Sequence, residues 1–393
     1  MYCAIICEFN PLTNGHVYLI KRAKEITGLP VICLMSGNFS QRGEPTILDK
    51  YTRAQFAIKA GADAVLELPA IYALSSAEMF ASGAIRILDS LGFISHIVFG
   101  SECGSLETLN AIADIKINEP PELKERLKIH LDDGHSYSSA LQQALEEEYT
   151  IPSDFFDGAN NILGLEYITA IKKQGSHITP LTIKRIDNGY NALVPCGNLG
   201  SASLVRNLAK SSETVYKIEN LVPPYVLPNL ITNPKVDNKT YSALVINNIR
   251  NTSVEDLEKY ADYSEGIEYR IKEMCDKYSS LQIATASIET KRYRKSRINK
   301  LLLYPLLGIT KNIYSEIESS LPVVKLLAIK NDKKHIISKA SKNISLIIRK
   351  EDLENLDNGQ SQSISIDLKA SNLYNLLIGL PHNADITTGT LFI

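Results

Sequence analysis

In the N-terminal part of the chain, short apolar runs alternate with longer amphipathic stretches. Four short and almost continuous apolar runs predict buried strands: Tyr2–Cys7, Pro30–Met35, Ala64–Leu68 and His96–Phe99. Three amphipathic stretches between them predict helices: His16–Ile26, Lys50–Ala60 and Ser76–Leu91. Strands that alternate with helices are typical of a parallel sheet with crossover helices, and continuous apolar strands indicate burial on both faces. The chain is therefore predicted to begin with an α/β, Rossmann-like fold.

The pattern becomes mainly helical further along the chain. The next predicted elements are helices over 105–150 and Asp157–Lys173, a strand over Leu181–Ile186 and a helix that starts at Ser201. Prolines cluster over Pro223–Pro234, and we place a boundary there between domains of residues 1–222 and 223–393. The second domain is expected to be mainly helical, with short strands at Val323–Ile329 and Ile344–Ile348. The apolar end, Leu391–Ile393, is expected to pack against the protein.

Composition narrows the class of protein. With 393 residues, 44% hydrophobic and 22% charged, the chain has the composition of a globular protein with two domains. No apolar stretch approaches the length of a membrane span, and the N-terminal apolar run is too short for a signal peptide. The six cysteines form no metal-binding pattern, so we expect reduced thiols in a cytoplasmic protein and no structural zinc.

Charge is spread unevenly, although the formal net charge is only −2. Between Lys291 and Lys350 the chain carries 15 lysines and arginines against 3 acidic residues. A basic segment on an acidic body indicates a polyanionic partner, and the part richest in cations, Lys291–Lys300, is the RNA candidate.

Candidate chemistry begins where the first predicted strand ends. A polar turn leads into a helix that starts near His16, and free N–H groups at such a helix start suit phosphate. The stretch Thr13–His16 resembles the nucleotidyl-transfer signature of the HIGH superfamily, in which two histidines flank a glycine and grip the α-phosphate of ATP. Such a donor stabilises the negative charge that develops during attack at phosphorus, and Gly15 permits close approach of the backbone.

A larger set of motifs resembles one family, the bacterial tRNA(Met) cytidine acetate ligases. The matching residues are Glu8–Pro11, Asn14–His16, Met35–Phe39, Gln41–Pro45, Asp49, Lys50, Arg53, Gly61–Asp63, Glu67–Pro69, Phe99–Glu102, Asn160–Gly164, Lys184, Arg185, Ser201–Ser203 and Arg206. The likeness is strong over residues 1–210 and thinner beyond them. It implies a HIGH-type nucleotidyltransferase domain followed by a helical C-terminal part.

The resemblance also implies a reaction in two steps. Acetate attacks the α-phosphorus of ATP and gives acetyl-adenylate and pyrophosphate. The N4 amine of the wobble cytidine of elongator tRNA(Met) then takes the acetyl group. Mg²⁺ is expected to accompany ATP, although no carboxylate cluster identifies a metal site held by the protein.

Site residues follow from the same motifs. The candidate catalytic residues are His16, Thr13 and Lys21. The expected ATP-binding residues are Cys7, Glu8, Phe9, Asn10, Asn14, Gly15, Gly100, Asn160, Arg185, Ile186, Ser203 and Arg206. Gln41 and Arg42 lie in a polar loop that binds either acetate or RNA, since an arginine fork suits carboxylate and phosphate alike. The expected RNA contacts are Lys291, Arg292, Tyr293, Arg294, Lys295 and Arg297, with Tyr293 as a platform for an unpaired base.

Two departures from the family pattern keep alternatives open. Thr13 and Leu19 stand where the family usually has histidine, and Thr13 either contacts phosphate or only shapes the turn. The Thr13–His16 form also occurs in small-molecule adenylyltransferases, which transfer AMP to a phosphorylated metabolite without RNA, so that activity is the alternative. A non-catalytic RNA-binding protein is the third hypothesis. The basic C-terminal part argues against the second hypothesis, and His16, Ser203 and Arg206 argue against the third.

Overall fold

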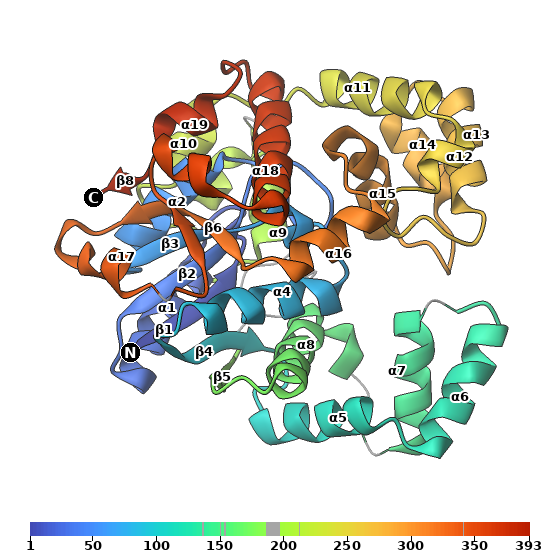
Figure 1. Ribbon diagram of the computed structural model, residues 1–393, viewed down its shortest axis with the longest axis horizontal. Coiled ribbons are helices and arrows are strands. Elements are labelled where there is room, and N and C mark those ends of the chain that lie inside the picture. Colours follow the sequence, from blue (N-terminus) through green and yellow to red (C-terminus); the bar gives the residue numbers. More distant parts are fainter. Residues whose placement is uncertain (136, 150, 153–154, 186–196, 212, 341) are drawn as a thin grey trace.

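The computed structural model describes the chain except residues 136, 150, 153–154, 186–196, 212 and 341. Within this described part, eight strands form one sheet in the order β5-β4-β1-β2-β3-β6-β7, with β8 beside β6 (Figure 1). Their bounds are β1 Tyr2–Cys7, β2 Val31–Ser36, β3 Ala64–Leu68, β4 Ile94–Ser101, β5 Thr179–Lys184, β6 Val323–Ile329, β7 Ser345–Ile347 and β8 Leu391–Phe392. Strands β1 to β5 are parallel, whereas β6 runs antiparallel to β3.

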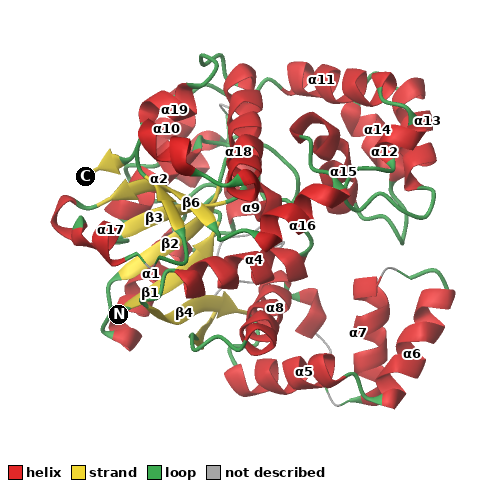
Figure 2. Cartoon of the chain, in the orientation of Figure 1, coloured by secondary structure: helices red, strands yellow, loops and turns green. Residues whose placement is uncertain are grey.

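Helices cover both faces of this sheet (Figure 2). One face packs on α1 (Asn14–Thr27), α2 (Lys50–Lys59), α9 (Ala202–Leu208) and α10 (Leu227–Thr232). The other packs on α3 (Ala70–Ala73), α4 (Ala77–Ser90), α8 (Ala159–Gln174), α16 (Lys311–Ser319) and α18 (Asn358–Leu377). Alternate residues of one strand enter different cores: Cys3 and Ile5 enter the first, and Ala4 the second. This division explains why the strands are continuously apolar.

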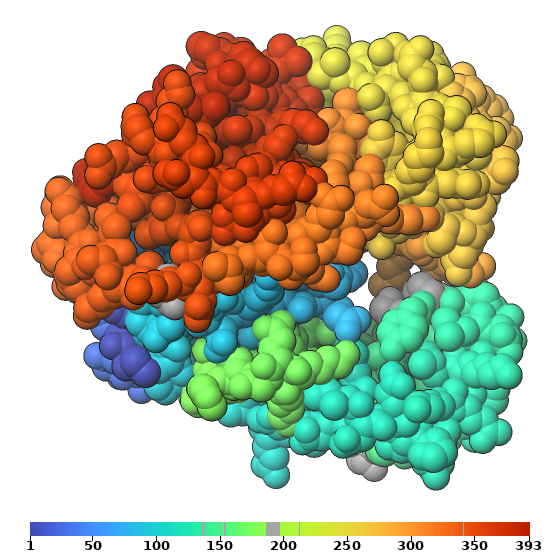
Figure 3. Space-filling view, viewed as in Figure 1, coloured from blue at the N-terminus to red at the C-terminus, as the bar shows by residue number. Residues whose placement is uncertain are grey.

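Two groups of helices extend from the sheet. One contains α5 (Leu106–Asn118), α6 (Pro121–Asp132) and α7 (Tyr137–Glu148). The other contains α11 (Asn238–Asn251), α12 (Val254–Leu257), α13 (Ile267–Lys277), α14 (Leu281–Ile288) and α15 (Lys295–Leu307). Figure 3 shows the surface hollowed between the two groups. The short helices α17 (His335–Lys339) and α19 (Ala384–Thr388) lie close to the C-terminal strands.

The structure confirms the predicted α/β fold and places every predicted strand within a few residues of its expected position. The region 105–150 forms three helices, and the chain end pairs with β6 as β8. The boundary near residue 222 stays a prediction, and β6, β7 and β8 from beyond it extend the N-terminal sheet. Among the described residues, no helix combines the length and the apolar character that crossing a bilayer requires.

Candidate active site

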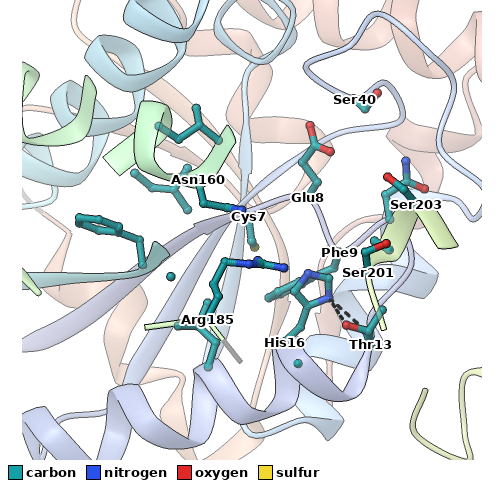
Figure 4. Close-up of a pocket in the computed structure, with 18 of the residues that line it drawn as sticks. Cys7, Glu8, Phe9, Thr13, His16, Ser40, Asn160, Arg185, Ser201 and Ser203 are labelled. Atoms are coloured by element: carbon teal, nitrogen blue, oxygen red, sulfur yellow. Dashed lines mark hydrogen bonds between the residues drawn. The ribbon is translucent and has the colours of Figure 1, made fainter. Parts of the chain in front are cut away.

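A cavity of about 270 Å³ opens at the carboxyl ends of β1, β4 and β5. Its walls come from the turn after β1, the loop between β2 and α2, the first turn of α8, the end of β5 and the start of α9. Figure 4 shows side chains from these separate segments around one shared space. Open α/β sheets bind ligands at the carboxyl ends of their strands, so this cavity is the candidate active site.

Buried polar contacts fix the turn between β1 and α1. Phe9 has a positive φ of 47°, a conformation that costs a non-glycine residue about 1 kcal/mol or more. Asn10 is buried, and its side-chain oxygen accepts a hydrogen bond of 2.9 Å from the backbone N–H of Ile47. The carbonyl oxygen of Asn10 accepts a second bond, of 2.6 Å, from Nη1 of Arg206. These contacts offset the strain and bring a distant arginine to the turn.

His16 lies in the first turn of α1, and one side of its ring is already bonded. Its Nδ1 accepts a hydrogen bond of 3.0 Å from the backbone N–H of Thr13, so the proton of the neutral ring is on Nε2. Burial, followed by the positive charges of Arg185 and Arg206, lowers the pKa of His16 to about 3. The Phe9 ring packs against it, with centroids 5.1 Å apart. His16 is thus an uncharged ring at neutral pH, with Nε2–H as a donor.

Two arginines make the cavity positive. Arg206 lies on α9 and donates from Nη2 to the hydroxyl of Ser203 at 3.0 Å. Arg185 follows β5, and its guanidinium points toward His16 in Figure 4. A Cβ on Gly100 would lie 3.3 Å from Cγ of Arg185, so the glycine leaves room for this side chain. Guanidinium groups at the carboxyl ends of the strands suit phosphate or carboxylate oxygens.

The loop between β2 and α2, residues 37–49, forms a second wall and is bonded to the first. The carboxylate of Glu8 accepts a hydrogen bond of 2.7 Å from the backbone N–H of Gln41. An isolated antiparallel bridge between Phe39 and Pro45 closes the loop on itself. The loop therefore keeps its shape at the cavity through its own contacts and those with the β1 turn.

Arg53 connects the turn after β1 with the loop between β2 and α2. Its guanidinium is fully buried and donates to four backbone carbonyls, those of Glu8, Ser36, Gly37 and Leu48. Burial lowers the pKa of Arg53 because a charged group loses water there, and the carbonyl dipoles replace part of that hydration. The ends of β1 and β2 are thus held together by one side chain.

The first turn of α8 forms a third wall. The carboxylate of Glu102 accepts hydrogen bonds from the Asn160 side chain at 2.6 Å and from the Asn161 backbone N–H at 2.7 Å. The Asn161 side chain in turn accepts from the backbone N–H of Cys103 at 3.0 Å. A carboxylate at a helix start bonds N–H groups that the helix leaves unpaired, so Glu102 fixes Asn160 at the cavity wall.

Most residues predicted for the site line this one cavity. They are Cys7, Glu8, Phe9, Asn10, Thr13, Gly15, His16, Gln41, Arg42, Gly100, Asn160, Arg185, Ser203 and Arg206. Ile186 lies outside the described residues. Asn14 does not line the cavity, because its side chain donates instead to the carbonyls of Asn198 and Asn220. The roles of the predicted residues that line the cavity, in binding and in catalysis, stay predictions.

Lys21 does not belong to the cavity, which corrects one predicted catalytic residue. It lies beyond the first turn of α1, its side chain is 74% exposed, and its Nζ is 3.9 Å from Glu25. The helical rotation from His16 directs Lys21 to solvent instead of toward the ligand side.

The basic segment before α15 also differs from its prediction at one position. Lys291, Arg292, Arg294 and Lys295 are exposed, as an RNA contact requires. Tyr293 is a core residue, only 8% exposed, and its hydroxyl donates to the carbonyl of Glu265 at 3.3 Å. This burial removes Tyr293 as an exposed platform for a base. Arg297 is half-buried, 5.2 Å from the centre of the Tyr293 ring.

Sequence reasoning missed an apolar wall of the cavity. Its side chains come from β1, β4, α4, α8 and β5, namely Ile6, Phe99, Phe80, Leu163, Tyr167 and Ile183. Phe99 and Tyr167 meet edge to face with ring centroids 5.5 Å apart. In the sequence these residues resemble ordinary core positions, so their periodicity carries no signal for a site.

The part of the chain that the structure describes includes no group of three or more His, Cys, Asp or Glu side chains that could hold a metal ion. Mg²⁺ commonly binds the phosphates of a nucleotide and keeps several water molecules. The expectation that Mg²⁺ accompanies ATP stays a prediction.

Known proteins that resemble this chain fall in the class that its parallel sheet and its His16 turn indicate, the nucleotidyltransferases. The family model described as HIGH Nucleotidyl Transferase matches residues 1–387. A tRNA(Met) cytidine acetate ligase of Acetivibrio thermocellus is 38% identical over 87% of this chain and 86% of its own. One of Caldanaerobacter subterraneus is 39% identical over 86% of this chain and 85% of its own. The chain belongs to the HIGH nucleotidyltransferases and, within them, to the tRNA(Met) cytidine acetate ligase family.

Solved structures agree with this assignment. The apo crystal structure of Thermotoga maritima TmcAL superposes with a TM-score of 0.89 and 27% identity, and covers 100% of both chains. A second structure of that protein, bound with alpha-thio ATP, gives a TM-score of 0.88 over 100% of this chain and 99% of its own, also at 27% identity.

Proposed function

We propose that this protein is an ATP-dependent tRNA-modifying ligase. It activates acetate as acetyl-adenylate and acetylates N4 of the wobble cytidine of elongator tRNA(Met). The observation that carries the proposal is the neutral His16 ring, which holds Nε2–H as a donor in a cavity with two arginines. Membership of the ligase family and the ATP analogue in the Thermotoga maritima relative support it.

In the first step a carboxylate oxygen of acetate attacks the α-phosphorus of ATP, and the bond to the pyrophosphate oxygen breaks. Negative charge grows on the equatorial oxygens of the α-phosphate. Nε2–H of His16 donates to one of them, and its lack of charge lets it keep its proton throughout. Arg206, together with Ser203, balances the charge that pyrophosphate carries away. Mg²⁺ bound to the triphosphate would shield part of its negative charge.

In the second step the N4 amine of cytidine attacks the carbonyl carbon of acetyl-adenylate. The C–N bond forms, the bond to the AMP oxygen breaks, and the amine loses one proton to water or to the released AMP phosphate. Adenylation is needed because acetate is a poor acyl donor and the exocyclic amine is a weak nucleophile. The exposed cations that begin at Lys291 bind tRNA phosphates. We place this reaction in the cytoplasm, where tRNA and reduced thiols occur together.

The test separates the two steps. Purified protein is assayed for acetate-dependent exchange of labelled pyrophosphate into ATP, and then for label from acetate in N4-acetylcytidine of total tRNA. We expect both signals from the wild type. His16→Ala should slow the exchange by about 10²- to 10³-fold, the usual effect of losing one donor to a developing oxyanion. His177→Ala is the matched control, because that histidine is exposed and distant from the cavity lining.

Two results would oppose the proposal. Exchange at the wild-type rate in His16→Ala would remove His16 from its role. No acetate-dependent exchange in the wild type, with ATP still bound, would favour a small-molecule adenylyltransferase and direct the search to phosphorylated acceptors.

A further inference from the structure

Helix α15 contacts the cavity loop, residues 37–49, although the two segments lie far apart in sequence. Gly43, at the tip of the loop, has a positive φ of 70°, and a Cβ there would lie 2.7 Å from the backbone nitrogen of Lys300. The same Cβ would lie 2.9 Å from the carbonyl carbon of Asn299. Backbone therefore meets backbone at this point, and only glycine allows so close an approach.

Side-chain contacts surround this backbone contact. Nδ2 of Asn299 donates to the carbonyl oxygen of Arg42 and to the carboxylate of Glu44, both at 3.3 Å. Nζ of Lys295 lies 3.7 Å from the same carboxylate. Arg42 and Glu44 both line the cavity. The first turns of α15 are thus joined to the cavity rim.

The same turns carry the exposed cations. Lys295 is the first residue of α15, its side chain is 60% exposed, and Lys291, Arg292 and Arg294 precede it on the surface. Because Lys295 itself reaches Glu44, a phosphate bound by these cations is held beside the mouth of the cavity. One surface therefore carries the exposed cations and also contacts the cavity rim.

The cavity loop has contacts that hold its shape besides those with α15. The loop is already closed by the Phe39–Pro45 bridge and bonded to Glu8 through the backbone of Gln41. Helix α15 has a further contact at the next residue, where Nζ of Lys300 donates to the carbonyl of Ser75 at 2.8 Å. We therefore expect loss of the Asn299 side-chain bonds to affect the position of the basic turn more than ATP binding.

We propose that the contact of Gly43 with α15, secured by Asn299, places the RNA acceptor at the mouth of the cavity for acetyl transfer. Asn299 is a positioning residue for the second step alone. This inference rests on the proposed function, since it assigns the route by which the bound tRNA reaches acetyl-adenylate.

The test measures the two steps separately in Asn299→Asp and Asn299→Ala. A carboxylate at position 299 would face the Arg42 carbonyl and the Glu44 carboxylate and would repel both. We expect acetate-dependent pyrophosphate exchange and tRNA affinity within about two-fold of the wild type, and single-turnover acetyl transfer at saturating tRNA reduced about ten-fold in the aspartate variant. The alanine variant, which loses the bonds without repulsion, should fall less, by about three-fold.

Asn251→Asp on α11 is the matched control, because that asparagine is exposed, and its side-chain bonds stay within its own helix. It should leave transfer unchanged. Equal loss of both steps in Asn299→Asp, unchanged transfer, or weaker tRNA binding without slower transfer at saturation would each overturn the inference. Failure of the proposed function would differ, because the wild type itself would then show no acetate-dependent exchange.

Discussion

Arg53 holds the carboxyl ends of two strands together, and Arg53→Met tests how strongly. Methionine has a similar length and keeps the apolar contacts of the stem, but it offers no donor. The substitution removes four hydrogen bonds to backbone carbonyls in a fully buried place. Its effect therefore isolates the polar part of this junction.

The expected magnitude follows from those four bonds. A hydrogen bond from a charged donor contributes about 1.5–3 kcal/mol, but burial also penalises the charge, as the lowered pKa of Arg53 indicates. We therefore assign about 1 kcal/mol to each bond, which gives a loss of about 4 kcal/mol in the free energy of unfolding. That is a large share of the roughly 5–15 kcal/mol by which native proteins are stable.

The assay is equilibrium unfolding in denaturant, monitored by circular dichroism. Arg53→Lys should lose about 2–3 kcal/mol, because one ammonium cannot reach four separated carbonyls. Arg22→Met is the control, since Arg22 lies on the exposed face of α1 beside Glu25 and should leave stability unchanged within error. A loss below about 1 kcal/mol in Arg53→Met would refute the argument that these bonds hold the strand ends.

Three further changes test other parts of the structure. Lys50→Met leaves the buried carboxylate of Glu67 without its cation, whereas Asp385 keeps Lys325, and should cost about 3–5 kcal/mol in denaturant unfolding; a loss under about 1 kcal/mol would contradict the pairing. The folded pKa of His16 lies below its unfolded value of 6.5, so its contribution to stability is present above pH 6.5 and is lost as the pH falls toward 3. Unfolding measured across that range should show wild type losing stability relative to His16→Gln; parallel curves would refute this. Gly164→Ala places a Cβ 2.5 Å from the Phe99 ring, so it should raise the KM for ATP several-fold in the exchange assay, and an unchanged KM would oppose the assignment of the apolar wall.

Local sequence patterns predicted the strands and helices, but not which of them lie side by side in the folded protein. The apolar run Val323–Ile329 is β6, as its composition indicates. Its place beside β3, antiparallel to the rest of the N-terminal sheet, could not be predicted, because strand pairing depends on contacts between segments far apart in the chain. The same limit applies to Tyr293, whose basic neighbours indicate an exposed residue, whereas packing of the helices buries its ring.

Some features of the candidate site were also visible in the sequence, whereas others depend on the fold. The first strand, the turn after it and the start of the helix that carries His16 are consecutive in sequence, so the motif was visible without a structure. The protonation of its ring depends on burial and on Arg185 and Arg206, which arrive from much later segments. Lys21 shows the reverse error, because nearness in sequence to His16 placed it wrongly in the site.

The sequence by itself determined the α/β class, the strand and helix positions, the family and nearly half of the residues that line the cavity. These features rest on local periodicity and on short motifs, in which neighbouring residues carry the chemistry. Only the tertiary structure decided the apolar wall, the junction at Arg53 and the contact of Asn299 with Glu44, which lie 255 residues apart. Such contacts form because the folded sheet and its helices bring distant surfaces together, and no local pattern specifies which surfaces will meet.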